Sequence, residues 1–475
     1  MARGRLKKCQ RKGSTHKMDK EQRYIQKRIW KARLQSILFY VCRLFPVRER
    51  KIVFCCIEGT TGYSCNPKYI AEELIRRNAG YEMVWLVNDI SRKFPKEIRA
   101  VRNTLWNRAY HLTTAHFWID NSRKQLEARK RRGQIYIQTW HAKLGFKPTC
   151  LDRGASFSRI AYLVSKHDSD MIDYVLSNSK WYDDTLPTGM IYQGPVLRTG
   201  SPRCDILVSG REEGKRRVRE RYGLAEDVRI IMYAPTFRGG SQGTDRTVEV
   251  SQGFPDYQRL SGALEKRFGG KWCVFLRLHP QLVARNLDLR MADALPSDGG
   301  RMPVNESKTG QMSGNESMTG RMSGNESKAG QDSEDGKREP EMQNIEAQKL
   351  GVPEYRQVID VSRVDDMYEI LAGCDAFLTD YSSAAFDAAV MKVPVFLYTD
   401  DYEDYERERG KLLWDLRKLP FPLALHDEEL ECRILEFDEA DYREKLERLF
   451  RETEMVEDGK AAERVVDMIE NCIIV

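Results

Sequence analysis

Residues 378–398 read LTDYSSAAFDAAVMKVPVFLY, and this stretch decides the fold class. An apolar run ends at Asp380, a helical pattern begins near Ser382 or Ser383, and a second apolar run ends at Tyr398. Apolar runs that alternate with helical segments are typical of parallel strands joined by right-handed crossovers. The stretch therefore predicts one unit of an open, parallel α/β sheet.

The same alternation extends outward in two series, which predict two doubly wound, Rossmann-like domains facing each other across a cleft. We expect the first domain over residues 51–205, the second over 206–435, and C-terminal helices over 436–475 that pack back on the body. The predicted strands are residues 51–57, 81–87, 116–120, 134–140 and 173–179, and then 229–235, 272–280, 357–361, 375–380 and 393–398. A helix is expected over residues 67–77.

The N-terminal arm, residues 1–50, is strongly basic. It holds sixteen Lys or Arg and three acidic residues, a balance of +13, whereas the whole chain carries +7. Residues 1–20 are expected to be disordered. From Tyr24 to Phe45, apolar residues recur at helical spacing between basic ones, namely Ile25, Ile29, Trp30, Leu34, Ile37, Leu38 and Val41.

Such a basic amphipathic helix is typical of proteins that bind an anionic membrane surface. The alternative is a helix that packs on the body of the protein and leaves a basic face in solvent. Nucleic acid is not an expected partner, because the arm contains no recognisable binding module.

Cysteine usage and hydropathy favour a cytoplasmic protein. The eleven cysteines form no CxxC pair or Cys/His cluster, so neither a disulfide framework nor a metal site is expected. No apolar segment reaches the roughly 18 residues that a membrane span needs. Together with the basic arm, this predicts a peripheral protein on the inner face of the cell membrane.

A ten-residue repeat interrupts the second series. The units NESKTG, NESMTG and NESKAG recur within residues 301–334, a segment rich in Gly, Ser, Asn and charge. A repeat of this composition buries no core. It predicts a disordered surface insertion at about residues 290–350.

Polar residues gather where the apolar runs end, which is where ligands bind in open α/β sheets. His141, in QTWHAKLGFK, follows one run directly, and an imidazole suits proton removal from an alcohol near neutral pH. The alternative is a His that only caps the strand. Thr236 and Arg238 follow another run in MYAPTFRGG, where Arg suits phosphate oxygens and the alternative is a plain turn.

Two further segments fit a nucleotide diphosphate. Arg277 and His279, in FLRLHP, are expected on one side of their strand, where two cations suit a diphosphate. The other segment begins with Asp380. Backbone N–H groups and the hydroxyls of Ser382 and Ser383 at a helix start form an anion site, unless the serines are simple N-caps.

Asp387 lies one turn further along that helix, where a carboxylate suits a sugar hydroxyl. No metal-ligand spacing and no Asp-x-Asp motif appears. We therefore expect Arg, His and a helix start, rather than Mg²⁺, to neutralise the phosphates, and no cofactor.

These segments resemble those of the CDP-glycerol glycerophosphotransferase family, the teichoic-acid primases and polymerases. The resemblance runs from about Lys51 to the C-terminus, outside the repeats. It is carried by GYSCNPKYIAEEL, QTWHAKLGFK, TGSPRCDIL, YAPTFR, LRLHP, TDYSSAAFD, KVPVFLY and DYERERG.

The resemblance implies a GT-B-like architecture with CDP held mainly by the C-terminal domain. An acceptor hydroxyl attacks the β-phosphorus of CDP-glycerol or CDP-ribitol, and CMP leaves. The acceptor is then lipid-linked or polymeric. By resemblance, His141 is the general base and acts with His279, which holds the pyrophosphate with Arg238.

By resemblance, Ser382 and Ser383 contact the donor phosphates, and Asp387 contacts the nucleotide ribose or another donor-side group. From their own positions, Thr236, Arg277 and Asp380 are also expected on the donor side. Asn66 and Lys143 are expected on the acceptor side. Two positions depart from the family pattern. Ala142 and Lys143 follow His141 where the family usually reads Gly-Thr, and Cys65 precedes Asn-Pro where an acidic residue is frequent.

The leading interpretation is therefore an enzyme that makes a phosphodiester in a wall or capsule polymer. Two alternatives stay open. One is a GT-B glycosyltransferase that uses a nucleotide sugar, and the other is a non-catalytic binding protein on the membrane surface.

Overall fold

The computed structural model describes residues 2–236, 238–239, 248–249, 254–279, 358–409 and 411–474. Side chains are described from Lys20 onward, apart from those of residues 238–239, 248–249, 408–409 and 473–474. The predicted insertion and its repeats lie outside the described residues. All described residues belong to one compact unit, Met1–Arg285 with Gln357–Val475.

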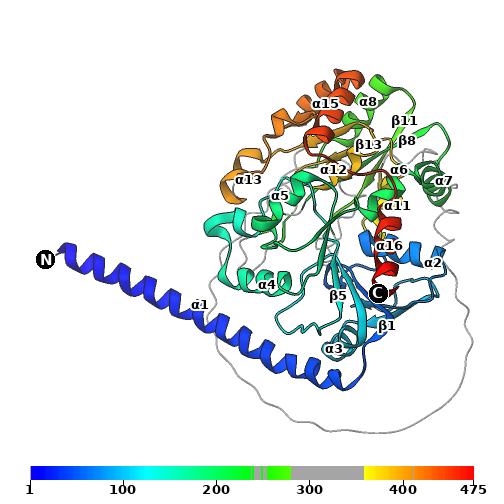
Figure 1. Ribbon diagram of the computed structural model, residues 1–475. Coiled ribbons are helices and arrows are strands. Elements are labelled where there is room, and N and C mark those ends of the chain that lie inside the picture. Colours follow the sequence, from blue (N-terminus) through cyan, green and yellow to red (C-terminus); the bar gives the residue numbers. More distant parts are fainter. Residues whose placement is uncertain are drawn as a thin grey trace, which may run out of the picture. The chain divides into compact units, whose positions relative to one another are not determined.

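The first sheet has seven strands in the order β3-β2-β1-β4-β5-β6-β7, and every pairing is parallel (Figure 1). Val53 of β1 pairs with Val84 of β2 on one side and with Trp118 of β4 on the other. Helices cover both faces of such a sheet, so its inner strands are apolar throughout. The strands are β1 Arg48–Cys55, β2 Glu82–Val87, β3 Ile98–Arg102, β4 Ala115–Asp120, β5 Ile135–Gln138, β6 Tyr174–Ser177 and β7 Val196–Arg198.

The second sheet has six parallel strands in the order β12-β11-β8-β13-β14-β15. Taken in chain order this is the 3-2-1-4-5-6 arrangement, which the first sheet shares over its first six strands. Both sheets confirm the predicted α/β, doubly wound architecture. The strands are β8 Val228–Ala234, β11 Lys271–Leu276, β12 Val358–Asp360, β13 Ala376–Thr379, β14 Val395–Tyr398 and β15 Leu423–Ala424; β9 Arg238–Gly239 and β10 Val248–Glu249 form a separate antiparallel pair.

The helices follow the predicted alternation, with the expected 67–77 helix found as α2. The longer ones are α1 Ala2–Val41, α2 Cys65–Arg76, α3 Leu105–Thr114, α4 Arg159–Ser169, α5 Lys180–Gly189, α7 Arg211–Tyr222, α8 Tyr257–Phe268, α13 Tyr402–Arg409, α14 Asp427–Leu435, α15 Glu439–Glu452 and α16 Ala461–Ile474. The short ones are η1 Cys42–Leu44, η2 Ile57–Gly59, η3 Cys150–Ser156, η4 Pro202–Cys204, α6 Asp205–Val208, α11 Met367–Leu371, α12 Ala384–Ala389 and η5 Leu416–Lys418.

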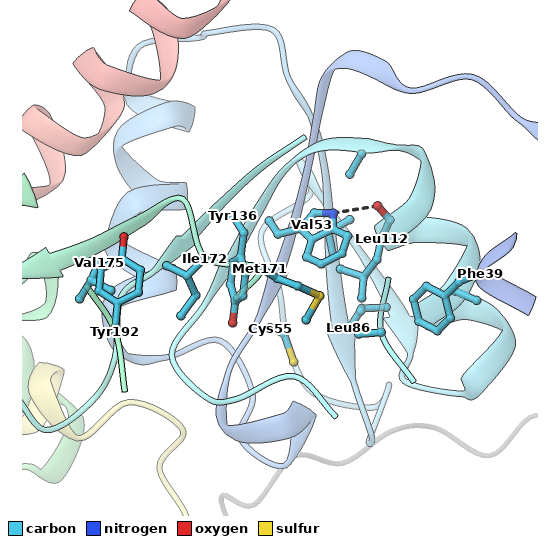
Figure 2. Packing of buried hydrophobic residues seen from close by; sticks show 14 of the residues in the cluster. Phe39, Val53, Cys55, Leu86, Leu112, Tyr136, Met171, Ile172, Val175 and Tyr192 are labelled. Atoms are coloured by element: carbon cyan, nitrogen blue, oxygen red, sulfur yellow. Dashed lines mark hydrogen bonds between the residues drawn. The ribbon is translucent and has the colours of Figure 1, made fainter. Parts of the chain in front are cut away.

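The core on one face of the first sheet joins distant parts of the chain (Figure 2). Phe39 of α1 is fully buried with Leu112 of α3 and Leu86 of β2. Trp118 is also fully buried, and its indole N–H donates to the Leu112 carbonyl at 2.7 Å. The end of α1 is therefore part of the hydrophobic core.

Helix α1 begins at Ala2, so the expected disorder of residues 1–20 is wrong. The segment contains no proline, and its many Lys and Arg residues are good helix formers. The single apolar face expected from Tyr24 onward is divided in two. Ile25, Ala32 and Phe39 are buried, whereas Trp30 is 65% exposed and Ile37 is 53% exposed.

The C-terminal helices return to both sheets, as the sequence predicts for this region. The Tyr442 hydroxyl of α15 donates to the Val393 carbonyl at 2.8 Å, beside β14. Val466 and Ile469 of α16 lie in the core of the first sheet, beside α2 (Figure 1). The last helix therefore belongs structurally with the N-terminal half of the chain.

Buried charges connect helix α2 with the loop before α11. The Lys68 ammonium lies 2.9 Å from Asp366 Oδ2, and the Tyr69 hydroxyl donates to the same oxygen at 2.7 Å. All three side chains are buried. These bonds connect α2, which packs on the first sheet, to the segment that follows β12 of the second sheet.

Buried His111 makes the stability of the fold depend on pH. Burial, with the nearby charge of Lys51, lowers the pKa of His111 to about 4. The folded state then binds no proton here between about pH 6.5 and 4, whereas the unfolded state does. The free energy of unfolding therefore falls as the pH drops through this window, and this group has no such effect above it.

We expect His111→Gln to remove roughly 2 kcal/mol of the stability loss between about pH 7.5 and pH 5. The measurement is urea unfolding at both pH values, with His116→Gln on β4 as the control imidazole. An unchanged pH dependence in the His111 variant would contradict the assignment.

Candidate active site

Polar groups lie at the carboxyl ends of the strands where each sheet reverses its order. In the first sheet these strands are β1 and β4, followed by Cys56 and Asn121; in the second they are β8 and β13, followed by Thr236 and Asp380. Such switch points are where open α/β sheets bind ligands. The sequence prediction that function gathers at these strand ends fits the observed topology.

His141 follows β5 and is held from two sides. Its Nδ1 lies 2.7 Å from the Asn121 carbonyl oxygen, which can only accept, so Nδ1 carries the hydrogen. Nε2 is then the nitrogen with the lone pair. Burial lowers the pKa of His141 below its usual range, which keeps the ring neutral at physiological pH. This is the protonation state that a general base needs.

The backbone before the imidazole is fixed by Asn66 of α2. Its amide nitrogen donates to the carbonyls of Trp140, at 2.7 Å, and Thr139, at 3.2 Å. Trp140 has a φ of 48°, a left-handed conformation that a non-glycine residue adopts only when its surroundings hold it there. Asn66 is fully buried, so the structure makes it a support for His141, whereas the sequence predicted an acceptor contact.

His279 lies close to two cationic side chains, Lys147 and Arg277. Burial, with the charges of Lys147 and Arg277 and the neighbouring His141, lowers the pKa of His279 to about 4, with Asp380 acting in the opposite sense. The structure therefore brings the two predicted catalytic histidines together. A site where several cationic groups disfavour each other's charge is a site that an anion stabilises.

Ser382 and Ser383 lie beside the loop that carries His141. A Cβ built on Gly145 of that loop would be 3.6 Å from Ser383 Cβ. Nearby, the Trp414 indole N–H donates to the Gly145 carbonyl at 3.2 Å. Ser382 and Ser383 are half-buried, and the Ser382 hydroxyl accepts from Ala384 N–H at 3.3 Å. The loop that carries His141 therefore lies against the serine turn at Gly145.

Asp380 shapes the loop after β8. The Thr236 N–H donates to one carboxylate oxygen at 2.9 Å, and the Thr236 hydroxyl donates to the other at 2.8 Å. The side chain of Arg238, which follows, lies outside the described part of the chain. A direct phosphate contact by Thr236 or Asp380 stays a prediction, but the pair fixes the backbone that leads to Arg238.

Arg277 differs from the predicted arrangement. Strand β11 ends at Leu276, and the Arg277 guanidinium donates to the carbonyls of Val361, at 2.7 Å, and Ser362, at 3.0 Å. Burial lowers the pKa of Arg277. The charge of Arg277 helps to lower the pKa of His279. Its hydrogen bonds, however, go to the loop after β12.

Arg203, which the sequence interpretation did not assign, lies at the centre of the site. Its guanidinium lies 2.7 Å from Asp387 Oδ2 and donates to the His141 carbonyl at 2.7 Å. The Tyr368 hydroxyl also donates to Asp387, at 2.6 Å. Asp387 is 5% exposed, so the structure uses it to hold Arg203, whereas the sequence predicted a donor hydroxyl contact.

The Lys143 side chain also forms its hydrogen bond within the protein. It is 5% exposed, and its ammonium donates to the Gly200 carbonyl at 2.8 Å. Burial lowers the pKa of Lys143 to about 8, partly offset by the charge of Glu457. Its expected place on the acceptor side stays a prediction.

The described residues contain no group of three or more His, Cys, Asp or Glu side chains placed to hold a metal ion. Among the same residues, no helix is long and apolar enough to cross a membrane.

The fold defines the class of protein: a GT-B-like α/β protein with two doubly wound, parallel sheets. The CDP-glycerol:poly(glycerophosphate) glycerophosphotransferase family model matches residues 37–295 and 341–471, and the chain belongs to this family.

Curated relatives and a solved structure agree. The chain is 24% identical over 450 residues to the teichoic acid poly(glycerol phosphate) polymerase of Bacillus subtilis strain 168, covering 91% of this chain and 50% of that protein. It is 23% identical to the protein of the same name from Bacillus spizizenii, covering 92% and 95%. The structure of the wall teichoic acid polymerase TagF matches with a TM-score of 0.67 and 22% identity, over 96% of this chain and 97% of that one.

The chain spans about half the length of some of these relatives, including the polymerases of Staphylococcus epidermidis and Bacillus subtilis. At this identity, the match to the solved structure establishes the fold.

Proposed function

We propose that this protein transfers a polyol phosphate, glycerol phosphate first of all, from a CDP-polyol to a hydroxyl of a lipid-linked or polymeric acceptor. The acceptor oxygen bonds to the β-phosphorus of the donor, the bond to the CMP oxygen breaks, and CMP leaves. The product is a phosphodiester of a teichoic-acid-like or capsule polymer. Family membership and the shared site of His141 and His279 support this reaction.

One observation carries the proposal: a neutral, oriented imidazole lies within a cluster of positive groups at the strand ends. His141 Nε2 accepts the proton of the acceptor hydroxyl. A diphosphate bound here would neutralise the charges of Lys147 and Arg277, which act on His279, and the hydroxyls of Ser382 and Ser383 lie next to the loop that carries His141. Phosphoryl transfer needs mainly this positioning and charge neutralisation.

The test is a donor panel with the purified full chain and a lipid-linked acceptor that has a free hydroxyl. We expect CMP from CDP-glycerol or CDP-ribitol, and mass spectrometry should find the acceptor extended by the polyol phosphate. Release of UDP from a nucleotide sugar would instead identify a glycosyltransferase. Binding of CDP-glycerol without any product would identify a binding protein.

We further propose that α1 places the enzyme on the inner face of the cell membrane, with the catalytic domains in the cytoplasm. Trp30, Leu34, Ile37 and Val41 follow each other at intervals of four, three and four residues, so they form one exposed stripe. Lys27, Lys31 and Arg33 flank this stripe in sequence. Apolar residues bordered by basic ones suit an anionic lipid surface.

A basic loop adjoins the C-terminal end of this stripe. Arg131 donates to the Phe45 carbonyl at 2.8 Å, and Arg43 donates to the Lys130 carbonyl at 3.3 Å. Leu44, which lies between Arg43 and Phe45 in the chain, is 85% exposed. The exposed apolar residues and the basic loop together extend the surface that lipid would contact.

We expect the double variant Trp30→Ser, Ile37→Ser to lose roughly tenfold or more of its partitioning onto anionic vesicles. Binding of the unaltered protein should weaken in high salt, because the basic contribution is screened. Cosedimentation measures both effects, and Leu435→Ser on α14, also exposed, is the control. Substitution is preferable to deleting residues 1–45, because Ile25, Ala32 and Phe39 belong to the core. Unchanged partitioning would show that the stripe has another role.

A further inference from the structure

Two cysteines contact the residues that hold His141, namely Asn121 and Arg203. Cys56 follows β1 and is fully buried, and Cys65 is the first residue of α2 and is half-buried. Cys56 Sγ lies 3.5 Å from the hydroxyl of Ser64, the residue directly before Cys65, and each thiol shifts the pKa of the other. The Asn121 amide donates to Cys56 Sγ at 3.0 Å. Asn121 therefore contacts Cys56 through its side-chain amide and His141 through its backbone carbonyl.

The surroundings of the two sulfur atoms are unequal. Cys65 Sγ accepts from the Arg203 guanidinium at 3.5 Å, and it begins a helix of twelve residues, whose N-terminus favours negative charge. The neighbouring Cys56 thiol is the largest influence that lowers the pKa of Cys65, to about 5, and Arg203 acts in the same sense. Burial raises the pKa of Cys56. Cys65 is therefore the thiolate and Cys56 the thiol.

We propose that Cys56 and Cys65 form an oxidation-sensitive pair that reacts with peroxides and reversibly inactivates the enzyme. The Cys65 thiolate attacks one peroxide oxygen and displaces hydroxide, which leaves a sulfenic acid on Cys65. The Cys56 thiol then attacks that sulfur and water departs, which leaves a disulfide. In total, two thiols and one hydrogen peroxide give one disulfide and two water molecules.

Disulfide formation disturbs the site through two contacts. It removes the negative charge that faces Arg203, whose guanidinium also holds the His141 carbonyl. It also pulls on the start of α2, where the next residue, Asn66, holds the carbonyls of Thr139 and Trp140. Cys65 has a φ of 58°, so its backbone is held in a conformation that a local shift relaxes. The loop that carries His141 then loses its two supports.

This inference rests on the proposed function for its activity readout, so the experiment has a second readout that does not. The full chain is treated with a small excess of hydrogen peroxide, free thiols are blocked, and peptides are mapped without reduction. We expect a peptide linking Cys56 to Cys65, loss of most CMP release, and recovery of both the free thiols and the activity after dithiothreitol.

Variants separate the two cysteines. In Cys56→Ser the sulfenic acid lacks its neighbouring thiol, so peroxide should oxidise Cys65 further and dithiothreitol should not restore activity. Cys432→Ser, which removes an exposed thiol on α14, should respond to peroxide as the unaltered chain does.

Absence of the linked peptide, or a linked peptide with unchanged CMP release, would overturn the inference. If the untreated enzyme releases no CMP, the proposed function fails, while peptide mapping still decides whether the pair forms.

Discussion

Replacing His141 with Asn should lower the rate of CMP release by about 100- to 10,000-fold, the usual contribution of a general base. An Asn amide can still donate to the Asn121 carbonyl, as Nδ1 does now at 2.7 Å, but it cannot take up the proton of the acceptor hydroxyl. The loop should therefore stay in place while the chemistry is lost. The measurement is CMP release from CDP-glycerol under saturating acceptor.

The control is His116→Gln, because His116 lies on β4 at the end of the sheet away from the site. It should release CMP at the normal rate. Because burial lowers the pKa of His141, the unaltered enzyme should also keep its rate down to below about pH 6.5. Normal turnover by the Asn variant would remove His141 from the role of base.

Much of the fold could be predicted, because buried parallel strands are continuous apolar runs with a strong local signal. Strands β3, β7 and β15 escaped prediction because edge strands are short, and β3 and β7 also mix basic with apolar residues. The start of α1 was missed for another reason. A basic, polar segment has the composition of a disordered arm, and its helix propensity is a weaker signal than its charge.

The site was predictable only where its residues follow strands directly. That rule identified His141, His279 and the serine turn. It could also have identified Asn121, which directly follows the apolar run of β4. Arg203 was not, because its partner Asp387 lies 184 positions further along the chain. Sequence position placed Asp387 correctly on its helix, but only the fold shows that Arg203 and Tyr368 occupy its oxygens.

Replacing Arg203 with Ala should destabilise the protein by about 3–5 kcal/mol, because it leaves the Asp387 carboxylate buried without its cation. Arg203 is 4% exposed and Asp387 is 5% exposed, so water does not compensate either charge. The measurement is urea unfolding. Arg198→Ala is the matched control: Arg198 pairs with Asp183 at 2.6 Å, but its side chain is 34% exposed, and such a pair contributes about 1 kcal/mol or less.

A second variant separates the stability of this ion pair from its part in catalysis. Arg203→Met with Asp387→Leu removes both charges and restores apolar volume, so most of the lost stability should return. CMP release should stay low, because no guanidinium then holds the His141 carbonyl or faces Cys65. Full activity in this double variant would show that Arg203 only balances Asp387. Low activity in a stably folded protein would show that Arg203 positions the base, and that the site depends on a contact between the two halves of the chain.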